Sequence, residues 1–306
     1  MMVNGRVVYL GGEYRPWDEA NVHIMSHSFG RGSAIFEVIS FSDTPAGPAV
    51  FRLDEHVSRF FRSASLLGME PPLTPGELQE AVLRTVKLSG LKAGLIKVFG
   101  FYPDISSGVL PPPRPFRAAV ITFLREEALG GKGESASDTV TACVSHWRRL
   151  DPQTVPIEAK VAANYVNGMV ARAEAREKGF DYAVLLDTQG FLAEGATESL
   201  FLVKEGRLMT PSLGTVLRSI TRKSLIAVAE EMGLETVTDR LNPALLEEAE
   251  EIFLSSTSAR VAPVRQIGTR IMGQAPGPLT QRIAERIAAI TAGRDERFRG
   301  WLFPAF

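Results

Sequence analysis

One stretch near the middle of the chain, Arg125–Asp138, interrupts the hydrophobic periodicity that runs through the sequence on both sides of it. It is rich in glycine, serine and charged residues and has no apolar pattern, which is typical of a linker. Its glycines lack the flanking motif and the lysine–hydroxyl ending of a phosphate-binding loop. For a chain of 306 residues, two domains are the natural expectation. We therefore predict an N-terminal domain over residues 1–125, a linker over 126–137 and a C-terminal domain over 138–306.

Strand and helix periodicities are mixed on both sides of this stretch. In the first part, Asp54 is the expected N-cap of one amphipathic helix, and Thr74, followed by Glu77 at the third helical position, is the expected N-cap of the next. Helices do not alternate strictly with strands, which disfavours a doubly wound Rossmann sheet and favours a mixed α/β fold of two domains. The expected helices are Asp54–Met69, Thr74–Ser89, Asn164–Lys178, Ser219–Gly233 and Pro278–Ala292, and the expected strands are Arg6–Tyr9, Ala34–Phe41, Ala49–Leu53, Gly94–Phe101, Phe116–Phe123, Tyr182–Leu186, Ser199–Val203, Arg207–Thr210 and Glu250–Leu254.

The bulk composition argues against several kinds of partner. Lysine and arginine number 34 against 35 aspartates and glutamates, so no polybasic surface for nucleic acid or membrane is expected. The N-terminus does not resemble a signal peptide, and no apolar stretch approaches the length of a membrane span. Cys143 is the only cysteine and lies in an apolar run, which predicts a buried thiol, a reducing compartment and a cytoplasmic protein. The four histidines show no metal-ligand spacing, so no metal is expected.

Several residues suit an aldehyde cofactor that carries a pyridine ring and a phosphate. Lys160 lies among small apolar residues ahead of a helix, a setting that suits an imine-forming lysine. Glu194 follows an apolar run, so its carboxylate is expected to point inward, where it needs a cationic partner such as a pyridinium. Each residue also has a plain structural interpretation, as a surface lysine or a turn carboxylate. Other candidates have the same ambiguity: capping or phosphate binding for Ser219, Ile220, Thr221, Thr257 and Ser258, and snorkelling or anion binding for Arg59.

The order and spacing of these residues resemble one family, the class IV aminotransferases that depend on pyridoxal 5'-phosphate. The resemblance runs from GSAIFEV at Gly32–Val38 to SSTSARVAPVRQIG at Ser255–Gly268, and the NYVN context around Tyr165 favours the branched-chain amino-acid branch. It implies the fold type IV architecture, with a small α/β domain and a larger pseudo-barrel domain. It also implies that Lys160 forms the Schiff base with the cofactor and moves the proton at the substrate α-carbon. Further cofactor contacts are implied for Tyr165 on the ring phenolate, Glu194 on the ring nitrogen, and Arg59, Ser219, Ile220, Thr221 and Thr257 around the phosphate.

The same resemblance points to a substrate pocket in which this sequence departs from the branched-chain pattern. Lys97 stands where an arginine is usual, Leu95 replaces a tyrosine, and Ser199 replaces an asparagine. Arg31 stands at an aromatic position and Val38 at a glycine, which narrows the pocket. Arg31 and Lys97 are interpreted either as carboxylate binders, for an acceptor such as 2-oxoglutarate, or as members of salt bridges. The substrate-binding candidates are Arg31, Phe36, Val38, Lys97, Val109, Ser258 and Ala259.

The resemblance implies a transaminase that moves an amino group between a branched-chain-like amino acid and a 2-keto acid such as 2-oxoglutarate or pyruvate. Alternatives are a D-amino-acid or (R)-amine transaminase, an aminodeoxychorismate-type lyase that releases pyruvate, and a non-catalytic binding protein on the same fold. The proline-rich, apolar loop Tyr102–Phe116 has no helical or strand period. Since such a loop is costly to leave exposed, and the resembled family packs it at the partner's site, we predict a homodimer or a higher homo-oligomer. A flexible lid within one subunit is the alternative interpretation.

Overall fold

The computed structural model describes residues 6–111, 115–128 and 139–306. The chain divides into two compact units that are interleaved along the sequence. Unit 1 comprises Met1–Lys132, Ala159–Ala163 and Ala289–Phe306, and unit 2 comprises Gly133–Glu158 and Asn164–Ala288. Of the range 126–137 predicted for the linker, residues 129–137 lie outside the described part of the chain. No described helix is long and apolar enough to cross a membrane.

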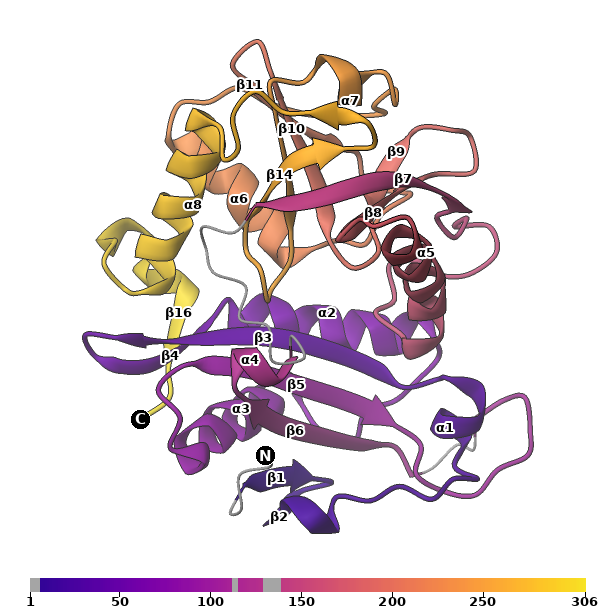
Figure 1. The fold of residues 1–306 in the computed structure, drawn as a ribbon. Helices are drawn as coiled ribbons and strands as arrows, with labels where there is room; N and C mark the ends of the chain where they lie inside the picture. The colour runs from indigo at the N-terminus through magenta and orange to yellow at the C-terminus, as the bar shows by residue number, and fades with distance from the viewer. Residues whose placement is uncertain (1–5, 112–114, 129–138) are drawn as a thin grey trace. The chain divides into compact units, whose positions relative to one another are not determined.

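Unit 1 is built on an antiparallel sheet, which in the described residues has seven strands in the order β16-β4-β3-β5-β6-β1-β2 (Figure 1). Its strands are β1 (Val7–Leu10), β2 (Glu13–Pro16), β3 (Ile35–Thr44), β4 (Gly47–Phe51), β5 (Gly94–Phe101), β6 (Arg117–Phe123) and β16 (Leu302–Pro304). Its helices are η1 (Trp17–Glu19), α1 (His27–Arg31), α2 (Leu53–Leu66), α3 (Pro75–Ser89), α4 (Arg125–Ala128) and η3 (Glu296–Trp301).

Helices α2 and α3 cover one face of this sheet and form the core of unit 1 with it. Alternate residues of β3, such as Ile35 and Ile39, meet Val57 and Phe60 of α2 in one apolar cluster. Because strand side chains alternate between faces, the residues between them, Phe36 and Val38 among others, belong to the opposite face. That opposite face carries three of the candidate pocket residues, Phe36, Val38 and Lys97.

The start of α2 corrects one prediction from the sequence. The helix begins at Leu53, and its N-cap is Arg52 in a left-handed conformation (φ 52°), so the expectation of Asp54 as N-cap is wrong. A tertiary contact decides this, since the Arg52 N–H donates to the carbonyl of Trp301 at 2.7 Å and its guanidinium lies 4.3 Å from the centre of that residue's ring. Thr74, by contrast, forms the predicted capping box with Glu77.

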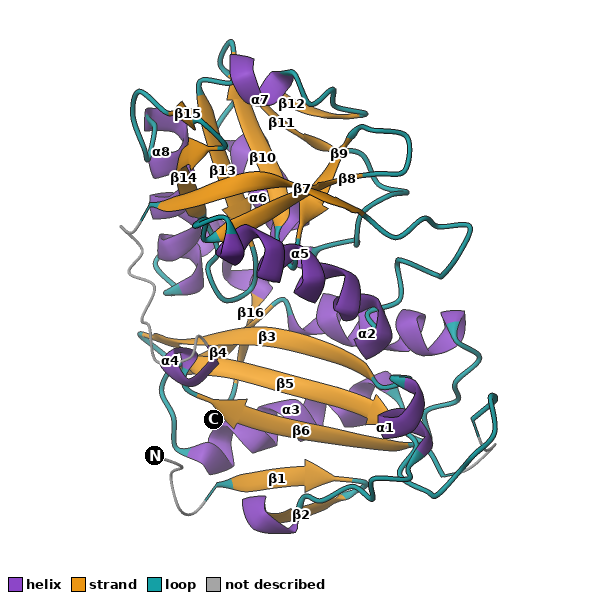
Figure 2. Ribbon diagram, turned by 45° about the vertical axis from the view of Figure 1, so that its right-hand side comes forward, coloured by secondary structure: helices purple, strands orange, loops and turns teal. Residues whose placement is uncertain are grey.

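Unit 2 contains a sheet that closes on itself. Strand β9 pairs with β8 on one side and with β10 on the other, which closes the circuit β10-β13-β14-β7-β8-β9 into a pseudo-barrel (Figure 2). The strands of unit 2 are β7 (Val140–Arg148), β8 (Tyr182–Leu186), β9 (Leu192–Gly195), β10 (Ser199–Lys204), β11 (Arg207–Pro211), β12 (Thr236–Asp239), β13 (Glu251–Ser255), β14 (Ala262–Ile267) and β15 (Arg270–Ile271). Its helices are η2 (Ala162–Asn164), which starts in unit 1, α5 (Tyr165–Glu177), α6 (Ile220–Glu231), α7 (Leu245–Glu248) and α8 (Pro278–Thr291), which ends in unit 1.

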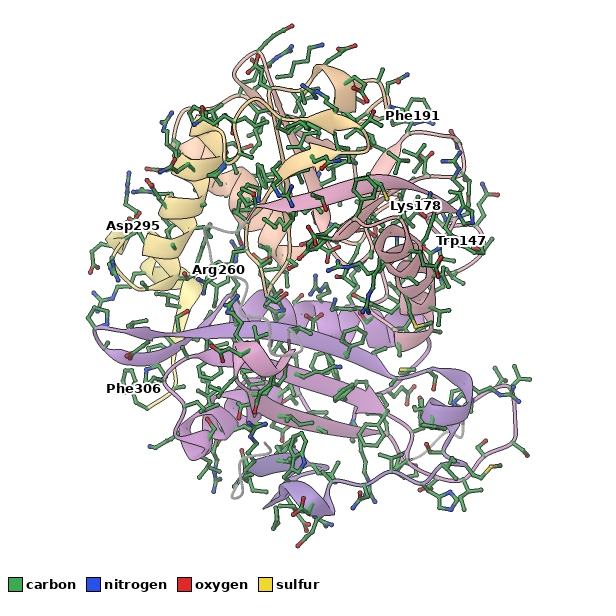
Figure 3. The ribbon with its side chains drawn as sticks, viewed as in Figure 1. Trp147, Lys178, Phe191, Arg260, Asp295 and Phe306 are labelled. Atoms are coloured by element: carbon green, nitrogen blue, oxygen red, sulfur yellow. The ribbon has the colours of Figure 1, made fainter. Side chains whose placement is uncertain are left out.

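Helix α5 packs on β7 and β8 through small side chains. Ala171 and Ala175 of the helix contact Cys143 and Ala183 of the strands, so the predicted burial of the cysteine is confirmed. Burial raises the pKa of the Cys143 thiol. Trp147 and Lys178 lie on this side of unit 2, near the ends of β7 and α5 (Figure 3).

Candidate active site

The segment that carries Lys160 is fixed to unit 1 by its backbone. The N–H of Phe36 on β3 donates to the Lys160 carbonyl at 2.9 Å, and the Lys160 N–H donates to Ser63 Oγ of α2 at 3.0 Å. The residues on either side of the lysine, Ala159 and Val161, are buried in the core of unit 1. The backbone of Lys160 is therefore held by β3 and α2 rather than by the helix that follows it in the sequence.

The ammonium groups of Lys160 and Lys97 both lie near the ring of Phe36, which is on the face of the unit 1 sheet opposite α2 and α3. Lys160 Nζ lies 4.8 Å from the centre of the Phe36 ring, and Lys97 Nζ lies 5.3 Å from the same centre and 4.7 Å from that of Phe99. In the described part of the chain, Lys97 has no carboxylate within ion-pair distance. Burial and the nearby charge of Lys160 lower the pKa of Lys97. A partly buried cation in an aromatic setting of this kind is a site for an anion.

The register of the strands shows what surrounds Lys97. It lies on β5 opposite Val38 of β3 and Ile121 of β6, so its cross-strand neighbours are apolar. The face thus combines hydrophobic surface, from Phe36, Val38 and Ile121, with one cation. Such a surface can accept a branched aliphatic group as well as a carboxylate.

Arg59 is buried on α2 and binds a glutamate that the sequence analysis did not select. Its Nε and Nη2 donate to Oε1 and Oε2 of Glu37 at 2.7 and 2.6 Å, and His56 Nδ1 lies 2.7 Å from Oε2. Burial alone would raise the pKa of Glu37, but the charge and hydrogen bonds of Arg59, together with His56, outweigh it and lower this pKa to about 2. Glu37 does have a sequence signal, since it is an acidic residue on the buried face of an alternating strand, between Ile35 and Ile39.

In unit 2, Glu194 lies on β9 and is 7% exposed, so its predicted burial is confirmed. Its Oε1 lies 2.6 Å from Arg149 Nε, and both carboxylate oxygens lie 3.3 Å from the N–H of Leu217. Arg149 was not predicted as a site residue, because nothing in the sequence of the Arg148–Arg149 pair distinguishes the buried arginine from its neighbour.

The first turn of α6 is arranged to accept an anion. Ser219 is its N-cap, as predicted, and accepts a hydrogen bond from the Arg222 N–H at 3.1 Å. Within the described residues, the N–H groups of Ile220 and Thr221 have no protein acceptor, and a helix N-terminus of this kind binds phosphate well. Another hydroxyl-rich segment is the turn Ser255–Arg260 at the end of β13. Ser256 Oγ stabilises this turn by accepting a hydrogen bond from the Ala259 N–H at 3.1 Å.

Tyr165 is the first residue of α5, and a glycine sets how closely that helix approaches the barrel. A β-carbon built on Gly168 would lie 2.2 Å from the carbonyl oxygen of Ala196 in the β9–β10 turn. Only glycine permits this approach. Tyr165 is half-buried and belongs to the same unit as Glu194.

Arg31 and Val109 form a separate group in unit 1. The guanidinium of Arg31 donates to the carbonyls of Ser107 and Gly108 at 3.1 and 3.3 Å, and His27 Nε2 lies 3.1 Å from the Val109 carbonyl. Arg31 therefore ties the loop to α1 rather than joining a salt bridge in the described structure. The Val109 side chain itself is 80% exposed.

Comparisons with known proteins define the family. Residues 34–267 match the family described as amino-transferase class IV. The branched-chain-amino-acid aminotransferase of Salmonella typhimurium is 35% identical over 97% of this chain and 96% of its own length. The chain therefore belongs to the class IV aminotransferases, and within them to the branched-chain amino-acid aminotransferase family.

Solved structures agree over the full chain. A T.th. branched-chain amino acid aminotransferase, solved with N-(5'-phosphopyridoxyl)-L-glutamate, has a TM-score of 0.93 at 33% identity and covers 100% of both chains. The enzyme of Thermobaculum terrenum, solved in its PLP form, has a TM-score of 0.90 at 29% identity and covers 99% of both. The predicted fold type IV architecture is confirmed, and so is the predicted class of enzyme, a pyridoxal-phosphate-dependent transaminase.

Proposed function

We propose that this chain transfers amino groups between branched-chain amino acids and 2-oxoglutarate, with pyridoxal 5'-phosphate as its cofactor. One observation supports this pair of substrates above all: Lys97 is a cation without a carboxylate partner among the described residues, set in an apolar face with Phe36 and Val38. The apolar side chains suit a leucine-like group, and the ammonium suits the distal carboxylate of glutamate or 2-oxoglutarate. The T.th. relative, solved with a phosphopyridoxyl derivative of L-glutamate, is consistent with this assignment.

Each unit, described by itself, contains residues that suit part of the cofactor. In unit 1, Lys160 would bind the aldehyde and Arg59 the phosphate. In unit 2, Glu194 would bind the ring nitrogen and Tyr165 the ring phenolate. The phosphate would also be bound by the first turn of α6 and the turn after β13, through Ser219, Ile220, Thr221 and Thr257. The α6 N–H groups that lack a protein acceptor among the described residues and the buried carboxylate of Glu194 are the features that a phosphate and a pyridinium require.

When bound, the cofactor supplies an electron sink for the bond broken at the substrate α-carbon. The side chains of the protein bind the substrate and move the proton. Lys160 Nζ accepts the α-proton and returns it. The backbone of this lysine is fixed to β3 and α2, while its flexible chain of methylenes allows Nζ to reach the proton. Lys97 orients a dicarboxylic substrate through its second carboxylate. Among the remaining pocket candidates, Ser258 and Ala259 are proposed to contact the substrate carboxyl group from the turn after β13.

Steady-state kinetics of Lys97→Met test the substrate assignment. We expect kcat/KM for 2-oxoglutarate to fall by about ten- to a hundredfold, because a charged contact is lost, whereas pyruvate, which has no second carboxylate, changes little. Lys97→Arg should restore most of the loss, and Lys92→Met, at an exposed position of the same unit, serves as the control. An equal fall with both acceptors would rule out the proposed role of Lys97.

A donor screen separates the remaining alternatives. Both enantiomers of leucine, valine and isoleucine, together with an (R)-amine, are offered with 2-oxoglutarate. We expect turnover of the L-amino acids; preference for a D-amino acid or an (R)-amine would assign the chain to one of those activities instead. Release of pyruvate from aminodeoxychorismate without an amino acceptor would indicate the lyase. The single buried Cys143 supports a reducing compartment, and we propose the cytoplasm.

We also propose a homodimer. The loop Tyr102–Leu110 and the segment around α1 expose large apolar side chains in unit 1: Ile24, Met25, Phe29, Ile105, Val109 and Leu110. The two segments are joined by backbone bonds from His27 N–H to Asp104 O at 3.2 Å and from Ser106 N–H to Met25 O at 3.1 Å. These bonds connect the loop to the segment around α1, so the exposed side chains of both form one apolar patch, which is typical of a protein interface.

A further inference from the structure

Arg149 is buried at the end of β7 and held in place by three elements of unit 2. Its N–H donates to the carbonyl of Leu186 at the end of β8, at 2.8 Å. Its Nη1 donates to Asn167 Oδ1 of α5 at 3.4 Å, and Asn167 Nδ2 donates in turn to the carbonyl of Arg148 at 2.9 Å. Its Nε lies 2.6 Å from Oε1 of Glu194 on β9. Side-chain exposure is 9% for both members of this ion pair.

The rest of the environment of Glu194 is also electropositive. The Leu217 N–H lies 3.3 Å from both carboxylate oxygens. Arg222 of α6 is buried, with its guanidinium bonded to Thr210 Oγ1 at 3.1 Å and to the Pro211 carbonyl at 2.7 Å, and its pKa is lowered by burial, an effect that the charge of Glu194 partly offsets. Of the two arginines, only Arg149 forms an ion pair with Glu194 in the described structure. It is therefore the group that can fix the orientation of the carboxylate.

We propose that Arg149 is a positioning residue for the cofactor: it keeps the Glu194 carboxylate ionised and oriented, so that this carboxylate binds a protonated ring nitrogen. The inference rests on the proposed cofactor role of Glu194. A carboxylate this deeply buried takes up a proton readily when its cationic partner is removed, because burial disfavours the charged form. A neutral carboxylic acid no longer stabilises a pyridinium, so the effect of Arg149 passes through Glu194 to the ring nitrogen.

A purely structural role would give a different pattern. Arg149 also links β7, α5 and β9, so its removal is expected to lower the melting temperature in either case. A structural role would weaken binding of every cofactor analogue to the same extent. A positioning role would weaken only the part of the binding that depends on the ring nitrogen.

The test therefore compares two ligands on the apoenzyme: pyridoxal 5'-phosphate and its analogue in which a C–H replaces the ring nitrogen. Dissociation constants are measured by absorbance titration for the wild type, Arg149→Met and Arg149→Lys. The wild type should prefer the natural cofactor, and Arg149→Met should lose about tenfold or more of this preference, because the buried carboxylate then lacks its ion-pair partner. Arg149→Lys, which restores the charge, should recover part of it.

Arg172→Met is the matched control, because Arg172 also pairs with a buried glutamate of unit 2, Glu198, at 3.3 Å. It should retain the wild-type preference. In the Glu194→Gln background, Arg149→Met should cause no further loss of preference, since the carboxylate through which it acts is gone. If Arg149→Met does not fold, Arg149→Gln, which keeps donors without the charge, is measured in its place.

The outcomes separate the inference from the proposed function. A wild-type protein that binds neither ligand overturns the cofactor proposal and this inference with it. A wild type that prefers the natural cofactor, combined with an Arg149 variant that keeps the full preference, overturns the role of Arg149 alone. A further loss of preference on adding Arg149→Met to Glu194→Gln would also contradict it, because the effect would then bypass Glu194.

Discussion

Two charged side chains of the candidate site, Arg59 and Glu194, are each fixed by a partner from another strand. Arg59 of α2 is held by Glu37 of β3, and Glu194 of β9 by Arg149 at the end of β7. Such supporting contacts lock the rotamers of the groups that would touch a ligand, so little ordering remains when the ligand binds. Their partners lie 22 and 45 residues away in sequence (59 − 37 and 194 − 149), so local pattern alone could not predict either pair.

Lys160 is expected to be the lysine that attaches the cofactor. Borohydride reduction of the purified holoenzyme followed by peptide mapping should therefore place the label on Lys160. Lys160→Ala should lose the absorption band of the attached cofactor and nearly all turnover, because it removes both the point of attachment and the proton carrier. Lys97→Met, which removes the other ammonium beside Phe36, should still be labelled at Lys160. A label on any other lysine would contradict the assignment.

Glu37→Gln should destabilise the protein strongly at neutral pH. The change leaves the buried guanidinium of Arg59 without its charged partner, which costs on the order of 3 kcal/mol in the free energy of unfolding. Since the pKa of Glu37 is lowered to about 2 in the folded state, the stabilisation by this carboxylate is complete above its ordinary pKa of about 4.5 and is lost as the pH falls toward 2. The stability difference between wild type and variant should therefore shrink over that interval.

Urea denaturation at a series of pH values measures this difference. Glu70→Gln, at an exposed glutamate of the same unit, is the control and should show a small difference at every pH. A constant difference between wild type and Glu37→Gln down to the lowest accessible pH would show that folding does not lower the pKa of this carboxylate. Cofactor affinity should fall as well, because Glu37 holds Arg59.

At the scale of elements, long amphipathic or alternating segments were predicted well from the sequence. The expected strands Gly94–Phe101 and Tyr182–Leu186 are β5 and β8, and the helix expected over Asn164–Lys178 is α5 at Tyr165–Glu177. Seven strands of the described structure were not predicted: β2, β7, β9, β12, β14, β15 and β16, of which β7 has nine residues and β14 six. A strand of two to four residues carries too little alternation to be recognised, and its pairing with a distant partner, such as β16 with β4, determines its structure.

The capping box of α3 should contribute measurably to stability. Thr74 Oγ1 accepts from the Glu77 N–H at 3.3 Å, and the Thr74 N–H donates to Glu77 Oε2 at 2.6 Å. Thr74→Ala removes the side-chain acceptor and should lower the free energy of unfolding by about 1 kcal/mol. Thermal or urea denaturation measures the loss. Glu80→Ala, on the exposed side of the same helix, should change stability by much less; an equal change in both variants would mean that the cap contributes nothing specific.

At the scale of the whole molecule, the two compact units are not continuous in sequence. Lys160 follows the predicted linker, yet its segment, Ala159–Ala163, belongs to unit 1 because the N–H groups of Ala162 and Ala163 donate to the carbonyls of Ala34 and Gly32. A contiguous boundary at 137/138, as predicted, assigns this lysine to the C-terminal domain. Sequence pattern cannot reveal such an exchange, because the bonds that define it join backbone groups more than a hundred residues apart. The cofactor role expected of the lysine came from the resemblance to the family, and its attachment to β3 was not predicted.

The apolar patch of unit 1 should mediate dimer formation. Val109 and Leu110 are 80% and 81% exposed, and the loop that carries them is held against α1 by Arg31 and His27. Val109→Asp places a charge in the middle of this patch, where burial by a second subunit would leave it unpaired. We expect light scattering to report a dimer for the wild type and a shift toward monomer for the variant, by about tenfold or more in the dissociation constant. Turnover should fall in parallel if the loop also contributes to the neighbouring site.

Leu88→Asp makes the same kind of change at an exposed residue of α3 outside the patch and should leave assembly intact. A wild-type monomer that is fully active at high dilution, or a Val109→Asp variant that dimerises and turns over normally, would exclude this role for the loop.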